Sequence, residues 1–164
     1  MPLATGRTWT YEVSDLRLSQ VVPMRVARKV SVDDVPGYEL TGPLGTARLA
    51  WHGPRLVAET LGSTTYAPPI PLLDARIPQG DVLWSGFVMA DGAVNDGHAT
   101  LTHKTAETPF ASHKVPAVET ILDLRVGKRR IELDSWFVDG VGLIKQEEHV
   151  DDVETVRISM TTGP

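Results

Sequence analysis

The stretch V-E-T-I-L-D-L-R-V-G-K-R-R-I-E-L-D-S-W-F, residues 118–137, decides the fold of this chain. Apolar and polar residues alternate on both sides of Gly127-Lys128. This period of two is that of a β-strand, in which successive side chains point to opposite faces. Glycine supplies the positive φ that a tight turn requires. The stretch therefore predicts a β-hairpin. Its first strand carries Val118, Thr120, Leu122, Leu124 and Val126 on one face, and its second carries Ile131, Leu133 and Phe137.

The same period of two recurs along the chain, at residues 9–13, 47–51, 99–101 and 156–160. No window of 11 or more residues shows a convincing helical period. The best helical candidate is the short segment 116–122, where Pro116 could occupy a first turn, although a strand suits it better. We therefore predict an all-β protein, with roughly ten antiparallel strands. The expected architecture is a single curved sheet that forms an open or incomplete barrel, with at most one short helix.

Fourteen glycines and twelve prolines interrupt the alternating runs at the spacing of a meander of short strands. The expected turns lie at residues 35–37, 41–43, 52–54, 91–92, 95–97, 126–128 and 139–140. Adjacent acidic residues, such as Asp33-Asp34 and Glu147-Glu148, point in opposite directions on a strand and so cannot share one site. We interpret these pairs as turns and solvated edges, and we expect Asp151-Asp152 to form the last hairpin.

Residues 63–80 differ from the rest, because they hold four prolines and show no alternation. Proline cannot donate a hydrogen bond to a central ladder, so the segment predicts a long extended connection. Two interpretations remain open: a crossover between two halves of one sheet, or a mobile flap that could act as a lid.

The bulk composition limits the classes of function. The length of 164 residues suits one domain, residues 1–164. A formal net charge of −5 argues against nucleic acid as a partner. The absence of cysteine excludes disulfides, thiol catalysis and thiolate metal sites. No apolar run is long enough for a transmembrane segment.

The compartment stays open between two alternatives. The N-terminal residues lack the basic and apolar regions of a secretory signal, which favours a cytoplasmic protein. The alternative is an exported protein from which the signal peptide has been removed.

Motifs that carry chemistry are absent. The five histidines, His52, His98, His103, His113 and His149, show none of the spacings typical of metal ligands. Convergence of His98, His103 or His113 with a carboxylate would be needed to support an enzyme. Neither a G-x-S-x-G elbow nor a phosphate-binding loop occurs. We therefore expect no catalytic residue, no metal, no cofactor and no enzymatic activity.

The four tryptophans, Trp9, Trp51, Trp84 and Trp136, each lie inside a predicted strand. One interpretation is that they stabilise a curved sheet by their large buried area. The other is that two or more of them line a concave apolar cavity. On the second interpretation, the candidate ligand-binding residues are Trp51, Trp84, Trp136 and Tyr66.

The stretch S-W-F-V-D-G-V-G-L-I-K-Q-E-E, residues 135–148, contains no nucleophile, and we interpret it as a turn between two strands. Lys145, Glu147 and Glu148 are expected on the solvated part of the return strand.

Part of this stretch, W-F-V-D-G-V-G-L-I-K-Q-E, resembles a signature of the bacterial DUF3108-like domains of uncharacterised function. Three further segments resemble stretches of the same family, in the family's order: G-R-T-W-T-Y-E-V, P-L-L-D-A-R-I-P-Q-G-D-V-L-W and K-V-P-A-V-E-T. In the last of these, Val118 stands where the family usually has glycine. Together the four matches span nearly the whole chain.

The family looks akin to the LolA/LolB-like lipoprotein carriers. The resemblance implies a curled antiparallel sheet and no catalytic set. By analogy with carriers that hold acyl chains in a concavity, it implies a non-enzymatic domain that binds an apolar small molecule, a lipid or a lipidated partner. The alternative is a protein-interaction or structural module with a barrel filled by its own side chains.

Overall fold

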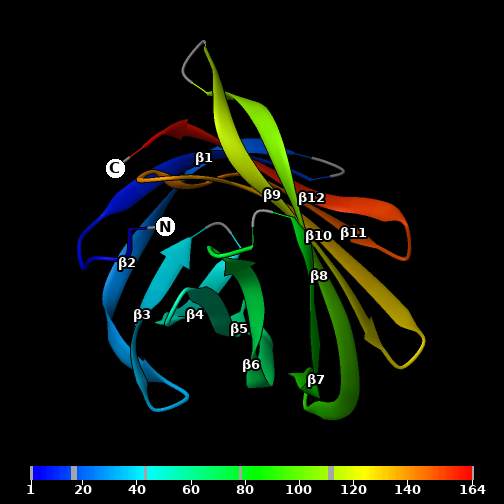
Figure 1. The fold of residues 1–164 in the computed structure, drawn as a ribbon. Coiled ribbons are helices and arrows are strands. Elements are labelled where there is room, and N and C mark those ends of the chain that lie inside the picture. The colour runs from blue at the N-terminus through cyan, green and yellow to red at the C-terminus, as the bar shows by residue number, and fades with distance from the viewer. Residues whose placement is uncertain (1, 16–17, 43, 78, 111–112, 164) are drawn as a thin grey trace.

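Twelve antiparallel strands form a closed barrel in the computed structural model, which describes residues 2–15, 18–42, 44–77, 79–110 and 113–163. Each strand pairs with its neighbours in chain order, and β1 also pairs with β12, which closes the sheet (Figure 1). The strands are β1 (Thr8–Asp15), β2 (Ser19–Val32), β3 (Val35–Gly42), β4 (Gly45–His52), β5 (Arg55–Leu61), β6 (Thr64–Asp74), β7 (Gly80–Ala90), β8 (Ala93–Phe110), β9 (His113–Val126), β10 (Arg129–Val138), β11 (Gly142–Val150) and β12 (Val153–Thr162).

The all-β prediction is confirmed, but the open barrel and the helix are wrong. The first and last strands pair from Thr10↔Thr162 to Asp15↔Val156, so the described sheet has no free edge at that seam. Closure leaves no row of unpaired backbone groups there, and single-strand patterns do not encode it. Segment 116–122 lies within β9, where Pro116 is opposite Glu107 of β8. The described residues contain no helix that could cross a membrane.

The hairpin predicted at residues 118–137 is confirmed as β9–β10, with Leu122 opposite Leu133 and a turn at Gly127-Lys128. The hairpin at Asp151-Asp152 is confirmed as well. Both aspartates there have positive φ, 51° and 66°, a conformation that aspartate tolerates better than most residues.

Two expected turns lie inside strands instead. Gly37 belongs to β3 and Gly97 to β8. At both positions a neighbouring group packs too closely for a side chain, and the chain does not turn. A Cβ at Gly37 would lie 2.6 Å from the carbonyl oxygen of Leu49. One at Gly97 would lie 2.6 Å from Val88 Cγ2. The turns at 53–54, 91–92, 127–128 and 139–141 are present, and Pro43 of the turn expected at 41–43 lies outside the described residues.

One continuous core fills much of the barrel. It is built from the inward residues of all the strands, and Leu3 and Ile77 pack against it from outside the strands. Trp9 and Tyr11 of β1 are fully buried in it. The Trp9 indole donates a hydrogen bond to the carbonyl of Val141 (3.0 Å), and the Tyr11 hydroxyl donates one to the carbonyl of Leu143 (2.6 Å). These bonds tie the first strand to the chain around the start of β11.

The proline-rich segment is not a crossover. It contains β6, which lies between β5 and β7 in chain order and pairs with β5 along most of its length. Its pairing with β7 is restricted to Thr65–Ala67, and residues 68–74 make no ladder with β7. Pro68, Pro69 and Pro71 supply no N–H, which is the physical reason for this interrupted seam. Pro78 lies outside the described residues.

Candidate functional site

A cavity of about 400 Å³ lies inside the barrel, at the end where the β3–β4 and β5–β6 hairpins turn. Most of its lining is aliphatic or aromatic. The apolar side chains are Met24, Leu40, Leu44, Ala47, Leu49, Leu56, Leu61, Leu72, Leu122, Leu124, Ile131, Leu133, Phe137, Leu143, Val156 and Ile158. They come from β2 to β6 and from β9 to β12, with Leu44 in the β3–β4 turn, because every second residue of a barrel strand points inward.

Glycines occupy the hairpin tips beside this cavity. Gly42, Gly45 and Gly62 belong to its lining, and Leu44 next to them is 40% exposed. A Cβ at Gly45 would lie 3.4 Å from the Cα of Gly62, so the two hairpin tips approach each other closely. Positive φ angles at Gly45 and Gly62, 89° and 60°, favour glycine at both turns. Leu44 and Ser63, which lie beside these glycines, also line the cavity at this end.

The polar side chains of the cavity lining are Thr46, Ser63, Thr64, Tyr66, Gln146 and Glu148. Gln146 and Glu148 of β11 reach it from one side, and Tyr66 of β6 reaches it from another. The Gln146 amide donates a hydrogen bond to Ser135 Oγ (2.9 Å). The Thr155 hydroxyl donates one to Glu148 Oε1 (2.7 Å). Among the described lining residues, Glu148 is the one carboxylate, and none is lysine, arginine or histidine.

The electrostatic field of Glu148 extends to Tyr66. Burial raises the pKa of the Tyr66 hydroxyl to about 12, and the negative charge of Glu148 contributes to the shift in the same direction. Tyr66 is therefore a neutral phenol at physiological pH, able to donate or accept a hydrogen bond. The cavity thus combines a mainly apolar lining with a polar region, formed by Tyr66 and Glu148, that holds a phenol and a carboxylate.

The structure places the four residues predicted to bind a ligand in different surroundings. Tyr66 lines the cavity. Trp84 packs edge-on against Tyr66, with ring centroids 6.1 Å apart, and its indole donates a hydrogen bond to the Pro68 carbonyl (3.1 Å). Trp51 is half-buried against the core and does not belong to the cavity lining. The Trp136 ring lies under Lys145 Nζ, 4.2 Å from the ring centroid.

Sequence reasoning missed the inward position of Glu148, which was expected on the solvated face. A β-bulge between Trp136 and Phe137 shifts the register of β10 against β11. Lys145 therefore pairs with Trp136, whereas Gln146 and Glu148 line the cavity. All four residues of K-Q-E-E are polar, so the sequence shows no alternation that would indicate which of them point inward.

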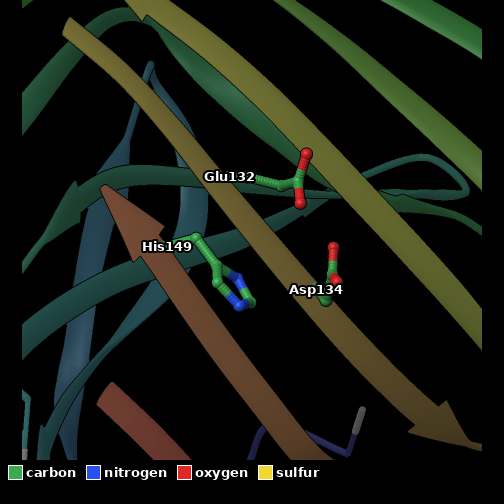
Figure 2. Close-up of side chains that lie close together, drawn as sticks. All are labelled: Glu132, Asp134 and His149. Atoms are coloured by element: carbon green, nitrogen blue, oxygen red, sulfur yellow. The ribbon is translucent and has the colours of Figure 1, made fainter. Parts of the chain in front are cut away.

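A second cluster, outside the cavity lining, brings together Glu132 and Asp134 of β10 and His149 of β11 (Figure 2). One donor atom from each residue lies within 4.8 Å of the other two. Glu132 and Asp134 are two residues apart on one strand face, and His149 is directly opposite Glu132. Two carboxylates and an imidazole could together accept a divalent cation. The E-x-D spacing was the only trace of this cluster in the sequence.

The charges around this cluster are partly compensated. Arg130 binds Glu132 and also Asp123 and Asp152, so it already neutralises one carboxylate. Burial raises the pKa of Asp134, and the charge of Glu132 adds to this effect. Asp134 Oδ1 and His149 Nδ1 are shielded from solvent without a hydrogen-bond partner. All three side chains are half-buried.

His98, His103 and His113 belong to no cluster of three or more potential metal ligands among the described residues, although His103 lies near the Asp74 and Asp81 carboxylates. His98 and His113 are exposed, whereas His103 is buried at the β6–β7 seam. His103 Nε2 accepts a hydrogen bond from the backbone N–H of Asp74 (2.8 Å), so its role there is structural.

The chain was compared with known proteins. No protein-family model matches it, and no curated protein matches it in sequence. Three solved structures share its fold over almost the full length. A candidate exported protein with a YmcC-like fold from Bacteroides fragilis has a TM-score of 0.58 and 9% identity, with 99% of this chain and 97% of that chain covered.

Two further solved structures share this fold. A candidate lipoprotein from Parabacteroides distasonis has a TM-score of 0.55 and 12% identity, with 99% and 97% of the two chains covered. The hypothetical lipoprotein YmcC from Escherichia coli has a TM-score of 0.51 and 10% identity, with 100% and 91% covered. At these identities the likeness shows the fold alone. The resemblance to DUF3108-like and LolA/LolB-like domains is not confirmed, whereas a fold shared with bacterial lipoprotein-like chains is.

Proposed function

We propose that this barrel is a non-enzymatic binding module that holds an apolar molecule or a lipid-like chain in its interior cavity. The observation that carries the proposal is the cavity of about 400 Å³, which is lined mainly by aliphatic side chains. This volume lies within the range of roughly 300–1,000 Å³ for small-molecule sites. Its glycine-bordered end gives such a molecule a way in.

The chemistry of the lining supports binding without catalysis. Its titratable groups among the described residues are Tyr66 and Glu148. General acid–base catalysis works best when the pKa of the group lies near the operating pH. Burial moves the pKa of Tyr66 to about 12, away from that range. A single carboxylate beside a neutral phenol suits the orientation of a ligand better than proton transfer.

The same proposal includes an exported location. The solved structures with this fold are named as lipoproteins or as an exported protein. A barrel that carries an apolar molecule would be useful in an envelope compartment, where lipids must cross an aqueous space. Fractionation of cells that express the full-length protein tests this part: recovery in the cytosolic fraction alone would contradict it.

Binding is tested with N-phenyl-1-naphthylamine, a neutral apolar dye whose fluorescence rises in apolar surroundings. We expect saturable binding of one dye per chain. Ala47 lines the cavity, so Ala47→Phe fills part of it and should weaken dye binding by about tenfold or more, which corresponds to about 1.4 kcal/mol. The matched control is Ala93→Phe, at an exposed position of β8, which should leave the affinity unchanged.

Two outcomes would contradict the proposal. Dye binding that is equal in both variants would place the dye outside the cavity. An absence of binding, with no lipid found by native mass spectrometry, would favour the alternative of a protein-interaction module. The apolar residues on β7 and β8, Leu83, Phe87 and Val94, which are 79%, 54% and 63% exposed, would then be the surface to examine.

A further inference from the structure

The polar region of the cavity carries information about the ligand beyond its apolar character. Glu148 and Tyr66 belong to the same lining, although they come from β11 and β6, which are not neighbours in the barrel. The space next to both groups is continuous with the aliphatic part of the cavity. A ligand that fills this cavity therefore comes into contact with a carboxylate and a phenol.

The charge of this region is negative and has no counter-ion within the described lining. The hydrogen bond that Glu148 accepts from Thr155 comes from a neutral hydroxyl. The nearest charged neighbour along the strand, Glu147, is held by ion pairs with Lys145 (3.0 Å) and Arg157 (2.9 Å), neither of which lines the cavity. A carboxylate in apolar surroundings gains most from a hydrogen-bond donor or a cation.

We infer that the ligand of this cavity is an amphiphile whose head group is cationic, such as a long-chain amine, and not an anionic lipid such as a fatty acid. The inference rests on the proposed function, since it assigns the head group of the molecule that the cavity holds. The ammonium would bind the Glu148 carboxylate and lie near the Tyr66 hydroxyl, and the chain would extend along the aliphatic lining. A fatty-acid carboxylate would instead be repelled by Glu148.

Three compounds with the same C12 chain test the head group: dodecylamine, dodecanol and dodecanoate. Each competes with N-phenyl-1-naphthylamine at pH 7.5, where the amine is protonated and the acid is ionised. A hydrogen bond to a charged group is stronger than one between neutral groups, so dodecylamine should bind at least about tenfold more tightly than dodecanoate. Dodecanol, which is neutral and can donate, should bind with intermediate affinity.

The Glu148→Gln variant removes the charge and keeps the shape of the side chain. Its amide oxygen can still accept the hydrogen bond from Thr155. We expect this variant to lose about tenfold in affinity for dodecylamine, to gain affinity for dodecanoate, and to bind dodecanol and the dye as before. The matched control is Glu107→Gln, the same charge change at an exposed position of β8, which should preserve the order of affinities.

The outcomes separate this inference from the proposed function. If the three compounds bind equally, or if dodecanoate binds most tightly, the cavity holds apolar chains but the inference about the head group is wrong. The inference is also wrong if Glu148→Gln keeps the preference for the amine. If the dye and all three compounds fail to bind, the proposed function and the inference are both wrong. Unchanged dye binding in Glu148→Gln shows that the variant is folded.

Discussion

At the scale of single residues, His103 shows how a buried polar group can replace a missing part of the backbone ladder. It is 1% exposed. Its Nε2 accepts from the Asp74 N–H, so Nδ1 carries the proton and lies 3.4 Å from the Gly80 carbonyl oxygen. Burial lowers the pKa of His103, although the Gly80 carbonyl and the charges of Asp74 and Asp81 oppose this shift. The neutral imidazole is therefore the form that the folded chain requires.

This requirement predicts a loss of stability in mild acid. The unfolded chain takes up a proton on His103 near the ordinary pKa of 6.5, whereas the folded chain takes it up only at lower pH. The free energy of unfolding should therefore fall as the pH drops through 6.5, until the folded pKa is also passed. Urea denaturation between pH 7.5 and 5 measures this slope.

The His103→Gln variant isolates this residue. Glutamine cannot titrate in this range, but its amide oxygen can still accept from the Asp74 N–H. The slope of stability against pH should flatten in this variant and stay as in the wild type in His98→Gln, at an exposed position of β8. An unchanged slope in His103→Gln would mean that other groups set the acid sensitivity.

At the scale of elements, the β6–β7 seam is held largely by side chains. Beyond Thr65–Ala67, the Trp84 indole bonds the Pro68 carbonyl, and His103 bonds the backbone of Asp74. Burial raises the pKa of Asp74, but hydrogen bonds from Arg76 and Arg55 outweigh this effect and hold that pKa below its usual range. Asp74 is therefore a buried carboxylate paired with two arginines at the end of β6.

Removal of the indole N–H should weaken this seam. Trp84→Phe keeps an aromatic ring but leaves the Pro68 carbonyl without its donor, which costs about 1–3 kcal/mol of unfolding free energy. The comparison is Trp136→Phe, where the smaller ring weakens a contact with Lys145 that is worth about 0.5–1 kcal/mol in total. Urea denaturation of both variants tests the difference. Equal losses, or a larger loss in Trp136→Phe, would show that the Trp84 hydrogen bond contributes little.

At the scale of the whole molecule, closure of the barrel distinguishes this protein from the open sheet predicted from its sequence. The terminal strands β1 and β12 have partners on both sides, and β1 also supplies the fully buried Trp9 and Tyr11. The long β8–β9 hairpin extends past the other strands at one end, as Figure 1 shows. The terminal strands are therefore part of the core.

Hydrogen exchange distinguishes a closed barrel from an open one. In a closed barrel, the amides of β1 and β12 should exchange as slowly as those of the β8–β9 ladder, because none of these strands is an edge. In an open sheet, half of the amides of each terminal strand would face solvent, and they would exchange as fast as the amides of frayed chain ends. Mass spectrometry of exchanged peptides that cover residues 8–15 and 153–162 provides the measurement. Fast exchange in both peptides would contradict closure.

The sequence by itself determined the fold class and several hairpins. Alternation at residues 118–137 and the turn at Gly127-Lys128 are local signals, since side-chain direction on a strand depends only on the parity of the residue. The tight turn at Asp151-Asp152 was also predictable from a local signal, the two adjacent aspartates between two runs of strand residues. These features need no knowledge of the rest of the chain.

Only the tertiary structure decided barrel closure, the cavity and the direction of Glu148. Closure depends on the pairing of β1 with β12, which lie at opposite ends of the chain. The bulge at Trp136/Phe137 sets which residues of β11 point inward, and strand parity alone cannot reveal it. The cavity is the space that inward side chains from all around the barrel leave unfilled, so its existence depends on how they pack together. Non-local pairing and packing leave no trace in the pattern of any one strand.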